Sequence, residues 1–233
     1  MDMPIVRYGD RGHPLLLFPT AQADFLENER FYLVKAVEKH MLAGRLQVFS
    51  IDSINKHAWM NRQVSVTEKA RRQALYAAYV EDEVVPHIRR CVGSPSVRIA
   101  TSGASFGAFH AANQFFRRPD YFDTLIAMSG FYDLGPDYLH GQMDDNIYYN
   151  NPIGYLRNLG DHGMLETLRR RSQIHLLTGQ GAYEAPDASR RFSQLLWDKS
   201  IPHNLDVWGH DVNHDWPWWR KMLDHYVGSR LGW

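Results

Sequence analysis

A serine between two glycines is the residue of this chain whose setting best suits nucleophilic chemistry. Residues 103–107 read Gly-Ala-Ser-Phe-Gly, which matches the pattern G-x-S-x-G. In that pattern a strand enters a sharp turn, the serine takes a strained backbone conformation and a helix begins at once. An ordinary glycine-rich turn is the alternative interpretation. The apolar run "VRIA" before the turn and the helical pattern after it favour Ser105 as a nucleophile.

A serine hydroxyl is a weak nucleophile near neutral pH, so it needs a histidine base and an acid that orients this base. In a strand-turn-helix setting, the expected order along the chain is Ser, then Asp or Glu, then His. The segment "VWGHDVNHDWPWW" contains both His210 and His214. We favour His214 because it directly precedes an expected helix start at Asp215. His210, which follows the last predicted strand more closely, is the alternative.

Three residues are candidates for the acid. Glu184 lies in the loop "QGAYEAPDASRR", which follows a predicted strand. Asp187, in the same loop, also suits the first turn of a helix, where free backbone N–H groups stabilise a carboxylate. Asp133 follows the neighbouring predicted strand and has a simpler interpretation as a turn residue. Glu184 is therefore the preferred acid.

These residues together predict two-step acyl transfer through an acyl-enzyme. The negative charge that develops on the carbonyl oxygen needs two fixed donors. We expect one to be the backbone N–H of Phe106, the residue after the nucleophile, and the other to come from Thr20 or Ala21, after the run "PLLLFP".

Short apolar runs alternate with helical patterns along the chain, which predicts an α/β fold with a mainly parallel sheet covered by helices on both faces. The predicted strands span 14–19, 45–52, 96–102, 124–130, 174–179 and 203–209. The predicted helices span 28–42, 66–90, 106–117, 187–199 and 217–228, with a cap expected at "SVTE", residues 65–68.

The segment 131–172 departs from this alternation and is rich in Tyr, Asn, Asp and Gly. We expect it to form a cap-like excursion over the strand ends within a single domain spanning 1–233. Trp59, Trp216 and Asp133 are candidates for lining a substrate pocket, although aromatic residues are more often part of a core.

Composition limits the partners. The chain has 233 residues, and its 26 basic and 26 acidic residues cancel, so no strong overall field attracts nucleic acid or an anionic membrane. Its single cysteine, Cys91, cannot form an intramolecular disulfide. The N-terminal residues lack a signal-peptide pattern and no apolar run approaches 18 residues, so a soluble, cytoplasmic protein is expected.

Five segments in order, "TSGASFGAFHA", "SGFYDL", "TGQGAYEAP", "IPHNLDVWG" and "HDWPWWRKML", resemble the putative-esterase family of α/β-hydrolases. This family includes S-formylglutathione hydrolases, feruloyl esterases and mycolyltransferases. The resemblance runs from about residue 14 to the C-terminus. It implies an α/β-hydrolase fold and a serine esterase that needs no cofactor and acts on a small-molecule ester or thioester.

By position, the resemblance also implies Ser105 as nucleophile, Glu184 as acid and His214 as base. The chain departs from the family in two places. It begins close to the first central strand, so the family's N-terminal β-hairpin is expected to be short or missing. In addition, "FPTAQADF" is not the usual H-G-type oxyanion segment.

Other classes of function remain as alternatives. An acyltransferase would use the same three residues and exclude water, and a non-catalytic binding protein could keep the hydrolase fold. A metal site built from His210, Asp211, His214 and Asp215 is disfavoured, because this segment reads as a loop and lacks the H-E-x-x-H glutamate. Dinucleotide binding is disfavoured because "GASFG" lacks the G-x-G-x-x-G spacing.

Overall fold

A mostly parallel sheet organises the chain. The computed structural model describes residues 3–160 and 162–230, and within these ranges one seven-stranded sheet has the order β1-β3-β2-β4-β5-β6-β7. Its strands are β1 (Ile5–Tyr8), β2 (His13–Phe18), β3 (Leu46–Ile51), β4 (Ile99–Ala104), β5 (Phe122–Met128), β6 (Gln173–Thr178) and β7 (Asn204–Val207). Only β1 pairs in the antiparallel sense, with β3, among these strands. The predicted α/β class is confirmed.

The six predicted strands are confirmed with ends shifted by a few residues, whereas β1 was missed. It is four residues long and pairs with β3 from Ile5↔Ile51 to Tyr8↔Val48, at the edge of the sheet. Pairing with β3 stabilises this strand, and its own sequence is too short to show a pattern. In place of an N-terminal hairpin, the described chain therefore has one short edge strand.

Helices connect the strands. They are α1 (Glu27–Arg30), α2 (Leu33–Ala36), α3 (Glu38–Leu42), α4 (Val66–Tyr79), α5 (Val85–Val92), α6 (Phe106–Arg117), α7 (Gly135–Leu139), α8 (Asp145–Tyr148), α9 (Pro152–Asn158), α10 (His162–Arg170), α11 (Pro186–Asp198) and α12 (Trp216–His225), with π-helical turns η1 (Val80–Val84) and η2 (Tyr226–Arg230).

The predicted helix over 66–90 is confirmed as α4, η1 and α5 in succession, and the Ser65 hydroxyl accepts the expected cap bond from the Glu68 N–H at 3.2 Å. The predicted helix over 28–42 is instead divided into α1, α2 and α3. The division falls at Tyr32, whose φ of 62° does not belong to a right-handed helix.

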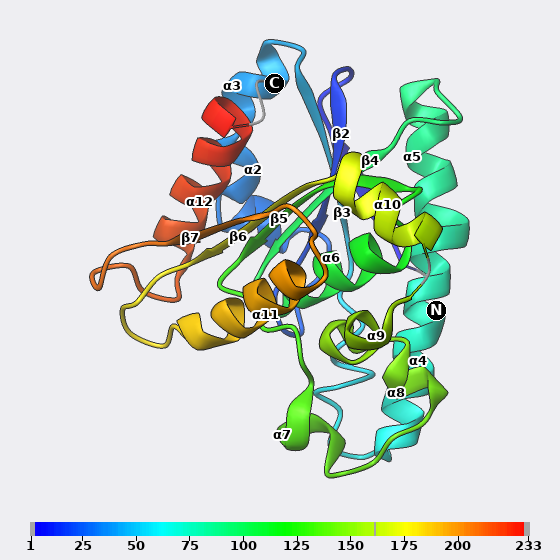
Figure 1. Ribbon diagram of the computed structural model, residues 1–233. Coiled ribbons are helices and arrows are strands. Elements are labelled where there is room, and N and C mark those ends of the chain that lie inside the picture. Colours follow the sequence, from blue (N-terminus) through cyan, green and yellow to red (C-terminus); the bar gives the residue numbers. More distant parts are fainter. Residues whose placement is uncertain (1–2, 161, 231–233) are drawn as a thin grey trace.

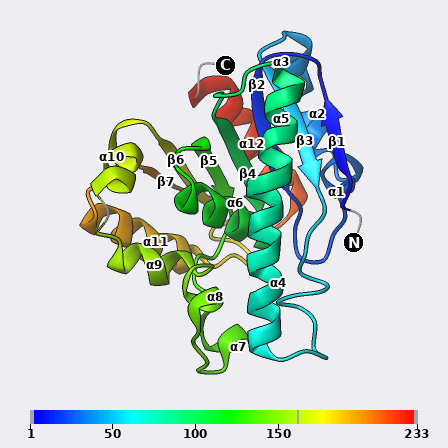
Figure 2. The ribbon, with the colours of Figure 1, turned by 90° about the vertical axis from the view of Figure 1, so that its right-hand side faces the viewer.

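Successive side chains of a strand point to opposite faces of the sheet, and both faces of this sheet are buried. Leu16 and Phe18 of β2 belong to one hydrophobic cluster, together with residues of α4, α5, α6 and α11. Leu15 and Leu17 belong to a second cluster, together with residues of α2 and α12. Helices therefore cover both faces, with α2, α3 and α12 on one side and α4, α5 and α6 on the other (Figures 1 and 2).

The excursion after β5 contains α7, α8, α9 and α10. It is joined to the body by buried side chains, since Ile147, Leu156 and Leu168 belong to the larger cluster. In Figure 1, α8 lies beside α4, and the chain then returns through α9 and α10 to β6. Within the described residues, no helix is long and apolar enough to cross a membrane.

Candidate active site

Ser105 lies in a sharp turn between β4 and α6. Its backbone has φ 56° and ψ −121°, a conformation that residues other than glycine rarely adopt. Its N–H donates to the carbonyl oxygen of Met128 at 2.9 Å, which ties the turn to the end of β5. The residue is half-buried, and its hydroxyl makes no capping bond to α6. The predicted strand, strained serine and helix are thus all present.

The two glycines of the motif allow backbones to approach closely. A Cβ atom on Gly103 would lie 2.4 Å from the carbonyl carbon of Gly107. A Cβ atom on Gly107 would lie 2.5 Å from the carbonyl oxygen of Phe18, at the end of β2. Either side chain would therefore force backbone to move, which explains why the turn needs glycine at both positions.

Two loops that bear candidate residues are bound together at the carboxyl edge of the sheet. The loop after β6 donates from the Gly181 N–H to the Val212 carbonyl oxygen at 2.9 Å, and the loop after β7 donates from the His214 N–H to the Ala182 carbonyl oxygen at 3.0 Å. The Asn213 side chain accepts a further bond from the Ala182 N–H at 2.8 Å. These bonds bring Glu184 and His214 close together. The two loops project side by side at the left of Figure 1.

The Glu184 carboxylate is the best-enclosed of the candidate acids. Its side chain is 1% exposed, and its Oε2 lies 3.8 Å from His214 Nδ1. Oε1 accepts from the Ser129 hydroxyl at 2.5 Å, and Oε2 accepts from the Thr178 hydroxyl at 3.0 Å. Burial raises the pKa of the carboxyl group, but the neighbouring His214, Ser129 and Thr178 outweigh it and lower the pKa below its ordinary value. Glu184 is therefore a carboxylate at neutral pH.

The His214 imidazole is held by packing. Its ring meets the Trp219 ring edge to face at a centroid distance of 5.0 Å, and its side chain is 24% exposed. Nδ1 is buried and forms no hydrogen bond to the described residues, because 3.8 Å to Glu184 is an ion-pair distance that exceeds hydrogen-bond length. The ring is thus placed beside Glu184 and is partly open to solvent.

The alternative acids and the alternative base lie in other settings. Asp187 is in the first turn of α11 and pairs with Arg190 at 2.8 Å, as its alternative interpretation predicted. Asp133 is exposed and accepts from the Gly135 N–H and the Asn151 side chain, so it closes a turn of the excursion. His210 is exposed in a turn of the loop after β7. Among the described residues, no three His, Cys, Asp or Glu side chains are grouped so that they could hold a metal ion.

The loop after β2 corrects one expectation about the oxyanion donors. Both the N–H and the hydroxyl of Thr20 donate to the Glu27 carboxylate, at 2.7 and 2.8 Å. The Thr20 N–H is therefore already hydrogen-bonded to Glu27 and does not serve as an oxyanion donor. The Ala21 carbonyl oxygen accepts from Ser53 and Asn55, both at 2.8 Å, whereas the Ala21 N–H forms no hydrogen bond to the described part of the chain.

The aromatic candidates differ in their positions. Trp59 is 2% exposed and its Nε1–H donates to Gln73 at 3.0 Å, so it belongs to the core and the expectation that it lines a pocket was wrong. Trp216 is half-buried and stacks on Phe31 with ring centroids 4.6 Å apart. It also meets Trp219 edge to face at 5.1 Å, which places it beside the residue that contacts His214.

Sequence reasoning did not place three residues beside Glu184 and His214, although it named Trp219 as a possible wall of a pocket. Ser129 was assigned to the interior of a predicted strand, but β5 ends at Met128 and Ser129 is the first residue beyond it. Thr178 ends β6, and Trp219 lies in the first turns of α12. The signal that could have identified Ser129 and Thr178 is a hydroxyl residue at the carboxyl end of β5 or β6, the two strands that follow β4 in the order of the sheet.

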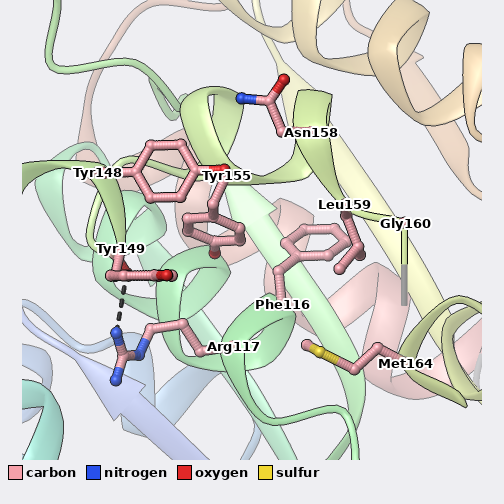
Figure 3. Close-up of a pocket in the computed structure, with 9 residues that line it drawn as sticks. All are labelled: Phe116, Arg117, Tyr148, Tyr149, Tyr155, Asn158, Leu159, Gly160 and Met164. Carbon is pink, nitrogen blue, oxygen red and sulfur yellow. Dashed lines mark hydrogen bonds between the residues drawn. The ribbon is translucent and has the colours of Figure 1, made fainter. Parts of the chain in front are cut away.

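A separate cavity lies at the far end of α6 from Ser105. Figure 3 shows this cavity of about 340 Å³, whose walls come from α6, the excursion and the link between its last two helices. Because Arg117 is the last of the 12 residues of α6, it lies about 18 Å along the helix from the motif serine. Two of its polar side chains have partners, since Arg117 donates to the Tyr149 carbonyl oxygen at 2.8 Å and Asn158 donates to that of Gly154 at 3.4 Å.

Solved structures share this fold at low sequence identity. A ferulic acid esterase superposes with a TM-score of 0.70 at 16% identity, covering 97% of this chain and 96% of its own. An S-formylglutathione hydrolase from Agrobacterium tumefaciens gives 0.68 at 13% identity, with 97% and 87% covered. MPT51 (FbpC1) of Mycobacterium tuberculosis gives 0.65 at 15% identity, with 99% and 93% covered. No curated protein sequence matches the chain.

The sequence itself matches one protein family over most of its length. Residues 47–229 match the family described as "Putative esterase". This range runs from β3 to η2 and includes the serine motif, the loop of Glu184 and the loop of His214. The chain therefore belongs to the putative esterase family, and it is a carboxylic ester hydrolase with the α/β-hydrolase fold.

Proposed function

We propose that the protein cleaves a carboxylic ester or thioester through an acyl-enzyme, with Ser105 as nucleophile, His214 as general base and Glu184 as the acid that orients the base. The main support is that a buried carboxylate lies 3.8 Å from the imidazole of His214, while Ser105 occupies the strained turn after β4. The spacing of 3.8 Å fits a resting site, because catalytic hydrogen bonds often shorten only when substrate is bound.

In the first half of the proposed reaction, Ser105 Oγ attacks the carbonyl carbon as its proton passes to His214 Nε2. Glu184 faces Nδ1, so it keeps the proton of the neutral ring on Nδ1 and stabilises the imidazolium that forms. The tetrahedral intermediate then collapses as Nε2–H protonates the leaving alcohol or thiol. In the second half, water attacks the acyl-enzyme by the same route and releases the acid.

Two backbone donors are proposed for the oxyanion. Phe106 is the first residue of α6, so its N–H has no acceptor within the helix. Ala21 is the second donor in this proposal, because the Thr20 N–H already serves Glu27. Each such donor contributes about 3 kcal/mol to transition-state stabilisation. The Ser53 and Asn55 bonds to the Ala21 carbonyl oxygen fix the loop in which the Ala21 N–H lies.

Replacing the nucleophile tests the proposal. Purified wild type is expected to hydrolyse members of a panel of p-nitrophenyl and thiol esters and to be labelled by a fluorophosphonate at Ser105. Ser105→Ala should abolish labelling and lower kcat by at least about 10³-fold, because the acyl-enzyme cannot form. Ser96→Ala is the matched control, since Ser96 is exposed and precedes β4, whose other end leads into the turn.

Two outcomes would count against the proposal in different ways. Hydrolysis that survives Ser105→Ala unchanged would remove Ser105 from the mechanism. Wild type that hydrolyses no ester and takes no label would favour a non-catalytic binding protein. Adding alcohols to the assay separates hydrolysis from acyl transfer, because an acyltransferase would form a new ester in preference to the free acid.

A further inference from the structure

A chain of hydrogen bonds reaches the Glu184 carboxylate from helix α12. The Trp219 Nε1–H donates to Ser129 Oγ at 2.9 Å, and the Ser129 hydroxyl donates to Glu184 Oε1 at 2.5 Å. All three side chains are enclosed, since Trp219 is 4% exposed and Ser129 is 7% exposed. The chain connects three segments of the protein, namely the end of β5, the loop after β6 and α12.

The chemistry of the groups fixes the direction of this chain. An indole N–H can only donate, and an ionised carboxylate can only accept. Ser129 Oγ must therefore accept from Trp219 and use its single proton toward Glu184. A hydroxyl that accepts one bond while it donates another is polarised, which strengthens its bond to the carboxylate.

The backbone directs Ser129 into this position. Ser129 has φ 48°, in the left-handed region that residues other than glycine seldom occupy, and its N–H donates to the Leu177 carbonyl oxygen at 2.7 Å. Strained backbone of this kind persists where surrounding contacts hold it. Here the strain places a hydroxyl between an indole and a buried carboxylate.

The other hydroxyl near Glu184 is a weaker support. Thr178 Oγ1 lies 3.0 Å from Glu184 Oε2 but also 3.2 Å from the Gly179 carbonyl oxygen, and it has one proton for the two acceptors. Ser129 has no such competing acceptor in the described residues. It is therefore the donor committed to holding one carboxylate oxygen while the other faces His214.

We propose that Ser129 and Trp219 are positioning residues that hold the Glu184 carboxylate and the His214 imidazole in a fixed position relative to each other. Trp219 acts on both members of the pair, because its N–H bonds to the hydroxyl that holds Glu184 while its ring packs on the His214 imidazole at 5.0 Å. This inference rests on the proposed function, since it assigns the two residues to the same acid and base.

The test compares variants that remove only the hydrogen bonds. Ser129→Gly removes the hydroxyl at a φ that glycine adopts freely, and Ser129→Ala removes it without adding backbone freedom. Trp219→Phe keeps an aromatic ring against His214 but lacks the N–H. We expect each variant to lower kcat by about 10-fold to 100-fold with KM changed less than about 2-fold, because the bond from Ser129 to the charged carboxylate is lost in the Ser129 variants and loses its polarising donor in Trp219→Phe.

Trp218→Phe is the matched control. Trp218 neighbours Trp219 on α12, and its ring faces the Lys221 ammonium at 4.3 Å, away from the bonds to Ser129. Its kcat should stay within about 2-fold of wild type. Thermal unfolding of each variant shows whether it is folded at the assay temperature. Values of kcat are compared only among variants that are folded.

A double-mutant cycle separates positioning from a general structural effect. In a Glu184→Ala background, Ser129→Gly should cause no further loss of kcat, because its target is gone. The inference is overturned if folded Ser129→Gly and Ser129→Ala keep wild-type kcat, or if their loss is equally large in the Glu184→Ala background. Failure of the proposed function has a different signature, in which Ser105→Ala and Glu184→Ala themselves leave hydrolysis unchanged.

Discussion

At the scale of single residues, the surroundings of a carboxylate determine what it can do. Glu184 and Asp187 are three positions apart, yet Glu184 is 1% exposed beside His214 while Asp187 is 75% exposed and paired with Arg190. The pKa of the Glu184 carboxyl is lowered from its ordinary value of 4.5. Its contacts therefore stabilise the folded protein fully at pH values above 4.5. That contribution is lost as the pH falls through the lowered pKa.

Glu184→Gln keeps the size of the side chain and removes its charge. We expect kcat to fall by roughly 10³-fold, because an amide neither stabilises the imidazolium nor holds the ring in the required tautomer. Asp187→Asn is the control and should keep wild-type kcat. The measurement is kcat of both variants on one activated ester. A large loss of kcat in Asp187→Asn with none in Glu184→Gln would assign the role of the acid to Asp187.

At the scale of elements, the turn of Ser105 depends on contact between α6 and the end of β2. Gly107 has no room for a side chain, since its Cβ would lie 2.5 Å from the Phe18 and 2.8 Å from the Pro19 carbonyl oxygen. Both atoms belong to backbone that leads into the loop of Thr20 and Ala21. The helix that begins after Ser105 and the loop of the proposed oxyanion donor are therefore positioned against each other.

Gly107→Ala should separate these two elements. We expect a loss of about 1 to 3 kcal/mol in the free energy of unfolding from overpacking, together with a fall in kcat as the Ala21 N–H is displaced. Gly154→Ala is the control, because its added Cβ meets only ordinary contacts at 3.7 Å or more within α9. Urea unfolding and kinetics provide the readouts, and a Gly107→Ala protein as stable and active as wild type would contradict this account.

At the scale of the whole molecule, a buried histidine links the core to the site. His110 of α6 is 1% exposed and lies 3.1 Å through Nε2 from Asn55 Oδ1. Because the Asn55 amide donates to the Ala21 carbonyl oxygen, its Oδ1 is an acceptor and His110 must carry its proton on Nε2. Burial lowers the pKa of His110 to about 3, so this network contains a neutral imidazole.

The lowered pKa of His110 predicts that acid destabilises the fold. In the unfolded chain this histidine binds a proton with the ordinary pKa of 6.5, whereas in the folded chain its pKa is lower. Its contribution to stability is therefore complete above pH 6.5 and falls as the pH drops toward 3. Between pH 7.5 and pH 5 the loss should be about 2 kcal/mol from this residue alone. The pKa of His203 is also lowered by burial, and it adds to the same slope.

Urea unfolding of wild type and His110→Gln at both pH values measures this contribution. The variant is expected to be less stable at pH 7.5, because glutamine cannot fill the aromatic site, but to lose less stability on acidification. His203→Gln serves as the comparison for the half-buried His203. An unchanged pH slope in His110→Gln would show that His110 is not the group responsible.

The sequence by itself determined the parts that rest on local signals. Apolar runs located the six strands β2 to β7, the spacing of Gly103 and Gly107 located the turn of Ser105, and the capping pattern at Ser65 located the start of α4. Each of these features depends on residues within one turn or one strand. The same local patterns could not show β1, whose four residues are stabilised by pairing with β3.

Only the tertiary structure decided which side chains meet. It placed Glu184, and neither Asp133 nor Asp187, beside His214; it committed the Thr20 N–H to Glu27; and it buried Trp59. It also brought Ser129 and Trp219, 90 positions apart, within 2.9 Å of each other. Such contacts depend on how loops from separate strands bind to one another at the carboxyl edge of the sheet, and no short pattern in a sequence records that arrangement.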